Sequence, residues 1–366
     1  MNKILTTTGV FALLSSAAFA GGLDRSGQSV AVIFEEGSYA EFSLGFVAPD
    51  VSGVGTAASP TPGGASGNMA DNYLQVGLAY KRDFTDNLSF ALILDQPFGA
   101  DVNYPAGVPY YATGATATLR ANALTGVLRY ETASNVSVFG GIRYQTLEAE
   151  AVVPFVGGYA VDGARDAGVG YLVGAAYERP DIALRVALTY NSSIDHDLAT
   201  VETGPVPGSS STAISTPQSV NLEFQSGIAA DTLLFGSIRW AEWSEFDITP
   251  VGYLAATGGG SLVSYENDTI SYSIGVGRRF NENWAGAITL GYEKANGGFS
   301  ANLGPTDGNT SIGIGVTYSQ DNWKIQGGLR YVDIGDADTT LDDTNAAANF
   351  TGNSAIGAGI KFGITF

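Results

Sequence analysis

The chain has 366 residues, no Cys, and 36 acidic against 17 basic residues, for a formal net charge of −19. This charge excludes nucleic acid as a partner because phosphate would be repelled, and the absence of Cys excludes disulfides and thiolate chemistry. The 49 Gly residues disfavour a helical domain, since each Gly weakens a helix by about 1 kcal/mol.

Residues 1–20 have the features of a secretory signal peptide. Lys3 supplies the positive charge, residues 9–17 are mostly apolar, and Ala18-Phe19-Ala20 fits a cleavage site before Gly21. No later stretch of about 18 apolar residues follows, so no transmembrane helix is predicted. We therefore expect an exported mature chain.

Residues 21–37 precede the first confident strand and are predicted to form a plug. The segment contains a short apolar run, Val30-Ala31-Val32-Ile33-Phe34. An equally good interpretation is that this run is an extra strand segment or a periplasmic lead-in.

From residue 38 to the end, apolar and small or polar residues alternate with a period of two. Residues 136–145, 182–190 and 323–331 show this pattern, and the last strand, 354–366, ends the chain on the aromatic residue Phe366. Alternation with an aromatic carboxy-terminus is typical of transmembrane β-barrels. Lys and Arg fall mainly on the small-residue face, as a barrel requires, because a cation facing lipid at mid-depth costs about 2–4 kcal/mol.

Short turns alternate with long loops along the chain. Six short turns and seven long loops predict about fourteen antiparallel strands with both barrel ends in the periplasm. The expected loops are approximately residues 52–71, 100–115, 151–166, 195–216, 247–267, 297–309 and 333–353. Fourteen strands enclose more space than one layer of side chains fills, which is the reason for expecting a plug.

The sequence offers little catalytic chemistry. His196 is the only His and lies between Asp195 and Asp197, where a strand is expected to enter a loop. We interpret it as a solvated loop residue and predict no catalytic residues, no metal site and no cofactor. The acidic residues are expected in solvated loops; bridging of divalent cations to lipopolysaccharide is an alternative that the sequence alone does not support.

Two of the expected outer loops are unusually apolar. Exposed apolar clusters mark binding grooves, so these loops are candidates for ligand capture; equally, they can pack on each other and cap the barrel. The candidate capture residues are Tyr104, Val108, Tyr110, Tyr111, Val153, Phe155, Val156 and Tyr159.

Local motifs give the chain a family resemblance. Residues 21–28, residues 42–51 and the run Trp240-Ala241-Glu242-Trp243-Ser244-Glu245-Phe246 resemble segments of the FadL/TodX group of outer-membrane transporters for long-chain fatty acids and hydrocarbons, and residues 272–280 are similar to another of their strands. The resemblance implies a fourteen-stranded barrel, an N-terminal hatch and a monomer. It departs from the family in lacking an Asn-Pro-Ala motif between Gly21 and Tyr39, which predicts a shorter or differently gated plug.

The resemblance also implies a lateral gate, formed where the third strand is kinked. Here that strand contains Pro97, Phe98 and Gly99. Pro97 removes a ladder donor and Gly99 frees the backbone, so a break in pairing is expected there on physical grounds as well. Alternatively, Pro97 only ends the strand at a loop.

The predicted function is passive uptake of a hydrophobic molecule by loop capture, lumen binding and lateral exit. Arg143, Arg185 and Arg239 are candidates for pairing with a ligand carboxylate, or else they pair with Asp and Glu of the lumen. Expected partners are the ligand, outer-membrane lipid, lipopolysaccharide and, through Phe366, the barrel-assembly machinery. The alternatives are a diffusion porin for small polar solutes and a structural or adhesive barrel.

Overall fold

The computed structural model describes residues 23–366. The predicted signal peptide and the first two residues of the predicted plug lie outside this range. Within it, no helix is both long and apolar enough to cross a membrane.

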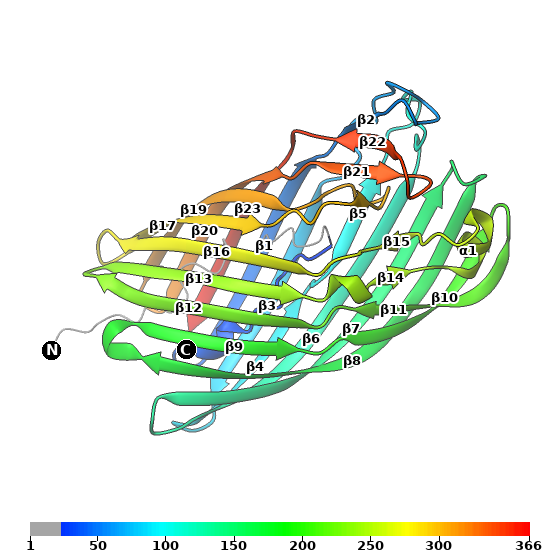
Figure 1. Cartoon of the computed structure of the whole chain (residues 1–366). Helices are drawn as coiled ribbons and strands as arrows, with labels where there is room; N and C mark the ends of the chain where they lie inside the picture. The colour runs from blue at the N-terminus through cyan, green and yellow to red at the C-terminus, as the bar shows by residue number, and fades with distance from the viewer. Residues whose placement is uncertain (1–22) are drawn as a thin grey trace.

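The structure is a closed antiparallel barrel of fourteen strands, as the alternation predicts. The barrel is drawn on its side in Figure 1, with the C-terminus and the short turns at one end and the longer loops at the other. Its sheet contains seventeen segments because three of the strands are interrupted. The segments are β1 (Tyr39–Asp50), β3 (Tyr73–Asp83), β4 (Leu88–Asp95), β5 (Gly99–Asn103), β6 (Thr116–Glu131), β7 (Val136–Val153), β8 (Tyr159–Arg179), β9 (Leu184–Asn191), β10 (Ile194–Thr203), β11 (Gly208–Thr216), β12 (Ser219–Ala229), β13 (Thr232–Ala241), β16 (Thr269–Arg279), β17 (Trp284–Glu293), β19 (Asn309–Gln320), β20 (Trp323–Ile334) and β23 (Asn353–Thr365).

The interrupted strands are the pairs β4/β5, β9/β10 and β11/β12. Closure comes from β1, which pairs with β23 from Tyr39↔Thr365 to Asp50↔Ser354. Every central strand thus has a neighbour on both sides, which a bilayer demands because it offers no water to unpaired backbone groups.

Small elements decorate the loop end and the lumen. They are η2 (Ala31–Phe34), β2 (Gly53–Gly55), η3 (Pro180–Ile182), η4 (Trp243–Glu245), β14 (Asp247–Ile248), α1 (Val251–Thr257), β15 (Val263–Ser264), β18 (Phe299–Ser300), β21 (Ala337–Thr340) and β22 (Ala346–Phe350). Strands β18, β21, β22 and β2 form a separate four-stranded sheet at the loop end.

Two of the expected loops are wrong in extent. Residues 151–166 and 195–216 are mostly strand, because β7 and β8 extend to a turn at residues 154–158 and β10 and β11 extend to a turn at residues 204–207. The alternation persists there: Leu147, Ala151 and Val153 are buried while Glu150 and Val152 are exposed. Gly, Pro and acidic residues in these stretches hide the pattern, since they are the residues that loops also favour.

The outer surface of the wall is apolar. Ile142 and Val169 are each 66% exposed, and Ile288 and Ile356 are similarly open. The alternate positions face inward, and Arg143, Arg185 and Arg239 are all buried there. The outward face therefore has the character of a lipid-facing band.

Introducing a charged side chain at mid-depth of this apolar band tests whether the band contacts lipid. We expect Ile142→Arg to destabilise the barrel by about 2–4 kcal/mol in bilayers, because the cation would face acyl chains. Tyr177→Arg, at the turn end of β8, is the control and should cost about 1 kcal/mol or less. Reversible urea unfolding in liposomes measures both, and equal costs would contradict a lipid-facing Ile142.

Candidate ligand path through the barrel

The N-terminal segment, residues 23–37, crosses the lumen. Its start pairs with the interruption between β4 and β5: the amide of Gly99 donates to the carbonyl of Leu23 (2.9 Å) and the amide of Arg25 donates to that of Pro97 (2.8 Å). Its end reaches β20, where Lys324 Nζ lies 2.9 Å from Glu35 Oε1. The segment therefore joins distant parts of the wall through the interior.

One buried ion pair holds the start of this segment. Arg239 Nε of β13 lies 2.6 Å from Asp24 Oδ2, and the two side chains are 7% and 0% exposed. The same guanidinium donates to Ser219 and Asn221 at 2.8 Å each and to Gln28 Oε1 at 3.1 Å. A buried pair whose remaining hydrogen-bonding groups are satisfied loses several kcal/mol when one partner is removed, because the other charge is left alone.

Further polar contacts fix the next residues. Arg25 Nη2 lies 2.7 Å from Asp101 Oδ2 of β5, and its guanidinium lies 3.9 Å from the centre of the Tyr73 ring. Ser26 donates to Asp95 Oδ2 at 2.5 Å, and Ser29 donates to Glu223 of β12 at 2.8 Å.

The apolar run at Val30–Phe34 is mostly buried. Its last four residues are the 3-10 helix η2, with Val32, Ile33 and Phe34 buried. Phe34 meets Phe139 edge to face at 5.8 Å and lies under the guanidinium groups of Arg129 and Arg185. The alternative of an extra strand is therefore not what the structure shows for these residues.

The wall is interrupted beside the N-terminal segment. The β3–β4 ladder ends at Leu78↔Leu94, and the amide of Val76 instead donates to the side chain of Gln96 at 3.0 Å. Beyond this point β5 pairs with β6, and no ladder in the described residues links β5 to β3. Pro97, Phe98 and Gly99 occupy the break, with Phe98 buried and its ring edge-on to Trp243 at 5.7 Å.

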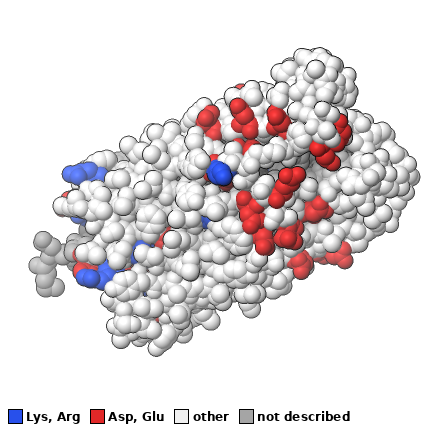
Figure 2. Space-filling model, viewed as in Figure 1, with Lys and Arg blue, Asp and Glu red and all other residues white. Residues whose placement is uncertain are grey.

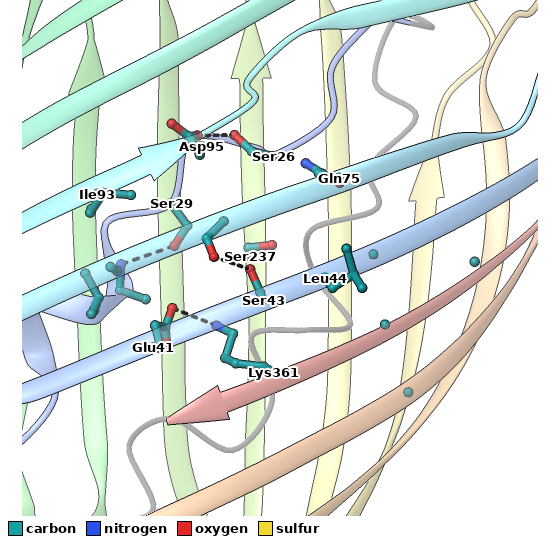
Figure 3. A pocket seen from close by; sticks show the side chains of 18 of the residues that line it. Ser26, Ser29, Glu41, Ser43, Leu44, Gln75, Ile93, Asp95, Ser237 and Lys361 are labelled. Carbon is teal, nitrogen blue, oxygen red and sulfur yellow. Dashed lines mark hydrogen bonds and ion pairs between the residues drawn. The ribbon is translucent and has the colours of Figure 1, made fainter. Parts of the chain in front are cut away.

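A cavity of about 250 Å³, with a mixed polar and apolar lining, lies beside this break. Figure 3 shows Ser26, Ser43, Gln75 and Asp95 around it, with the Glu41–Lys361 ion pair on its wall. The cavity is bounded by β1, β3 and the N-terminal segment, so any rearrangement of that segment changes access to it.

A second cavity, of about 50 Å³ and apolar, lies on the loop side of the N-terminal segment. Leu23 of that segment closes one side, and strands β5, β6, β7, β8, β10 and β11 supply the wall. Residues of the loop end, Leu262 and Leu303 among them, complete the lining. The buried side chains around it include Leu119, Ala151, Leu198 and Ile214.

The predicted capture residues form part of one apolar cluster. Tyr104, Tyr110, Tyr111, Val153 and Tyr159 are buried in it, and Val108, Phe155 and Val156 pack against it. Tyr110 stacks on Tyr104 at 5.5 Å and meets Phe350 edge to face at 6.4 Å, and Tyr111 meets Phe155 at 5.5 Å. In this conformation these residues contact one another, and their role in capture stays a prediction.

The three lumen arginines have different surroundings. Arg239 pairs with Asp24 of the N-terminal segment. Arg143 donates to Thr125 (2.9 Å) and Asn191 (3.1 Å). Arg185 lies over the Phe34 ring at 4.7 Å. Their pairing with a ligand carboxylate is untested.

The interpretation of His196 as a solvated loop residue is wrong. It lies in β10 with a fully buried side chain, 3.4 Å from Asp166 and 3.1 Å from Gln145 Nε2. The error follows from the misplaced loop, because His196 occupies an inward position of a strand that continues beyond it. Asp24, Arg25 and Ser26 were not predicted as site residues. The available indication was a cluster of polar residues in a segment expected to form the plug.

Comparison with solved structures shows the same fold. A Pseudomonas aeruginosa FadL homologue matches with 12% identity, 92% coverage of each chain and a TM-score of 0.74. The Ralstonia pickettii toluene transporter TbuX matches with 14% identity, coverage of 91% of this chain and 90% of that one, and a TM-score of 0.64. The Pseudomonas putida toluene transporter TodX matches with 14% identity, coverage of 92% and 91%, and a TM-score of 0.65.

The chain thus has the FadL/TodX-type barrel fold that its motifs suggested. No protein-family model matches the sequence, and no curated protein matches it.

Removing the Asp24 carboxylate should release the N-terminal segment. We expect Asp24→Asn to cost about 3–5 kcal/mol in the free energy that holds the segment in place, because Arg239 is left as an unpaired buried charge. Ion conductance in planar bilayers should then rise above that of the unchanged chain. Asp50→Asn, at an exposed position at the end of β1, is the control, and matching conductance in the two variants would contradict the anchor.

Glu202 of β10 anchors the loop that contains α1, because its carboxylate accepts hydrogen bonds from the amides of Gly252 and Tyr253. The stability of this loop should therefore depend on pH. Burial raises the pKa of Glu202, but hydrogen bonds from Tyr159, Gly252, Tyr253 and Ser210 outweigh it, so its pKa lies below its ordinary value. The anchor's contribution is therefore complete above about pH 4.5 and is lost as the pH falls through the lowered value. Protease protection of residues 249–262 should fall in that acid range and be insensitive to pH there in Glu202→Gln; equal pH profiles would refute the anchor.

Proposed function

We propose that this chain is an outer-membrane passive transporter for hydrophobic molecules. The observation that carries the proposal is a lumen crossed by the N-terminal segment at the same level at which the wall is interrupted between β3 and β5. A ligand entering from the loops meets an obstruction, and beside that obstruction lies the break at Pro97–Gly99. The known transporters TodX and TbuX, which share this fold, support the same function.

The proposed route has three stages. The ligand leaves water at the apolar cluster that contains Tyr104, Tyr110, Tyr111, Val153 and Tyr159, where each buried methylene contributes about 0.8 kcal/mol. It then occupies the apolar cavity above Leu23. Displacement of the N-terminal segment opens the way to the break at Pro97–Gly99, where the ligand enters the membrane sideways.

Several cellular expectations belong to this proposal. Residues 1–20 act as the export signal, residues 21–37 as the plug and residues 38–366 as the barrel. Outer-membrane lipid and lipopolysaccharide surround the wall, and Phe366, which is exposed and stacks on Tyr80 at 6.1 Å, is recognised by the assembly machinery. The transporter works as a monomer without a cofactor.

A diffusion porin is the second candidate function. The bonded N-terminal segment weighs against it, because a porin needs a lumen open to ions. Planar-bilayer recordings separate the two: a plugged transporter gives almost no conductance, whereas a porin gives large steady channels. Such channels from the unchanged chain would overturn the transporter proposal.

The break at Gly99 offers a direct test of lateral exit. A Cβ at Gly99 would lie 2.5 Å from the guanidinium carbon of Arg25, whose position is held by Asp101 and Tyr73. We expect Gly99→Val to shift the segment and reduce hydrocarbon uptake by about tenfold, the effect of a 1.4 kcal/mol change, while binding persists.

Gly327→Val is the matched control because Gly327 lies in β20, where the nearest heavy atom to an added Cβ is the Gly359 carbonyl oxygen at 4.0 Å. Uptake into liposomes or whole cells measures both variants, alongside binding of the same labelled hydrocarbon. Normal uptake by a folded Gly99→Val chain would remove the break from the route.

A further inference from the structure

The apolar cavity on the loop side of the N-terminal segment has no charged side chain facing into it. Of the residues that line it, only Glu150 is ionisable as a carboxylate or cation. Glu150 is exposed, accepts a hydrogen bond from Thr118 on the neighbouring strand at 2.7 Å, and alternates with the inward residues Ala149 and Ala151. The polar groups inside, Thr200 and Thr212, are bonded to each other at 3.2 Å.

The nearest cation along the N-terminal segment is already engaged. Arg25 follows Leu23 by two residues, but it pairs with Asp101 at 2.7 Å and stacks on Tyr73. Arg239, deeper in the lumen, is neutralised by Asp24. A carboxylate in the apolar cavity would therefore have to take a cation from an existing acidic partner.

The same neutralisation extends through the lumen. Lys324 pairs with Glu35 and Lys361 with Glu41. Arg185 lies in the field of Glu223, Glu178 and Glu35, and Arg143 in that of Asp95. Lys324 and Lys361 thus form ion pairs within the chain, and Arg185 and Arg143 have carboxylates of the chain nearby. Arg330, which also lines the lumen, donates to Ser311 at 2.7 Å.

The loop end of the barrel, where the ligand would enter, is acidic. Figure 2 shows Asp and Glu spread over the loop half of the visible face, with Lys and Arg mostly at the other end. Exposed acidic residues in the loop half include Asp197, Asp247 and Asp336. Of the basic residues there, Arg165 pairs with Glu148 at 3.0 Å. Such a surface lowers the local concentration of anions.

We infer that the path selects uncharged hydrophobic molecules and rejects carboxylates, fatty-acid anions included. The inference rests on the proposed transport function and assigns its substrate class. The physical reason is the cost of burying an unpaired charge, which a carboxylate escapes only by taking up a proton at a pH well above its ordinary pKa. A hydrocarbon, an alcohol or a neutral aromatic ring meets no such cost.

Two pairs of probes test the charge rule on the full mature chain in detergent. Toluene is compared with benzoate, and 1-decanol with decanoate, by equilibrium dialysis at neutral pH. We expect the neutral member of each pair to bind at least about tenfold more tightly, since an unpaired buried charge costs more than 1.4 kcal/mol. Equal affinity within either pair would overturn the inference while leaving the transport proposal standing.

Variants locate the effect in the cavity. Ala149→Phe fills the cavity and should weaken toluene binding by about tenfold, since the added ring takes the space that the ligand would occupy. Ala160→Phe makes the same substitution outside the set of cavity-lining residues, on a strand of the same wall, and is the control. Unchanged toluene binding in Ala149→Phe would refute the cavity as the site.

A gain of function completes the test. Thr212→Lys adds a cation to the cavity wall and should narrow the gap between 1-decanol and decanoate by about tenfold. Heat-modifiable migration on gels verifies that each variant has folded. If folded Thr212→Lys discriminates as strongly as the unchanged chain, charge is not sensed in this cavity. Failure of all four probes to bind the unchanged chain would instead overturn the proposed function and this inference with it.

Discussion

The structure depends on a wall one strand thick that separates lipid from the lumen. Each strand must place apolar side chains outward and small or polar ones inward, and every backbone group must find a partner in a neighbouring strand. The pairing of β1 with β23 meets the second requirement by removing both sheet edges. The first requirement confines cations to the interior, and this confinement supplies the groups that hold the N-terminal segment.

The interior cations explain why a short N-terminal segment can remain inside a wide barrel. Residues 23–37 bury only five apolar side chains, Leu23, Val30, Val32, Ile33 and Phe34. Ion pairs to β13, β5 and β20 also fix their position. Such pairs are costly to break one partner at a time, yet they can be exchanged or hydrated. Because these contacts are made by side chains, the segment can change position while the strand pairing of the wall stays intact.

The break in the wall and the N-terminal segment stabilise each other. Without Leu23 and Arg25, the backbone groups of Pro97 and Gly99 would lose the hydrogen bonds they now make. With them, β5 turns away from β3, and Gln96 satisfies the amide of Val76 in place of a strand. The N-terminal segment and the break in the wall therefore share the same contacts.

Sequence patterns were sufficient for the wall. The period-two alternation, the inward position of Arg143, Arg185 and Arg239, and the break at Pro97 follow from chemistry that acts within one strand or between a strand and lipid. Patterns failed where a strand leaves the membrane, at residues 151–166 and 195–216, because lipid no longer separates apolar from polar faces there. The burial of His196 was not predicted for the same reason.

By itself, the sequence determined a closed β-barrel with its cations inside, because lipid contact imposes that order on every strand locally. Only the tertiary structure decided which partner each cation takes: Asp24 reaches Arg239 across 215 residues of chain, and such a pairing leaves no local pattern. The tertiary structure also decided that the apolar cavity receives no charge, since its wall is assembled from six barrel strands, the loop end and the N-terminal segment.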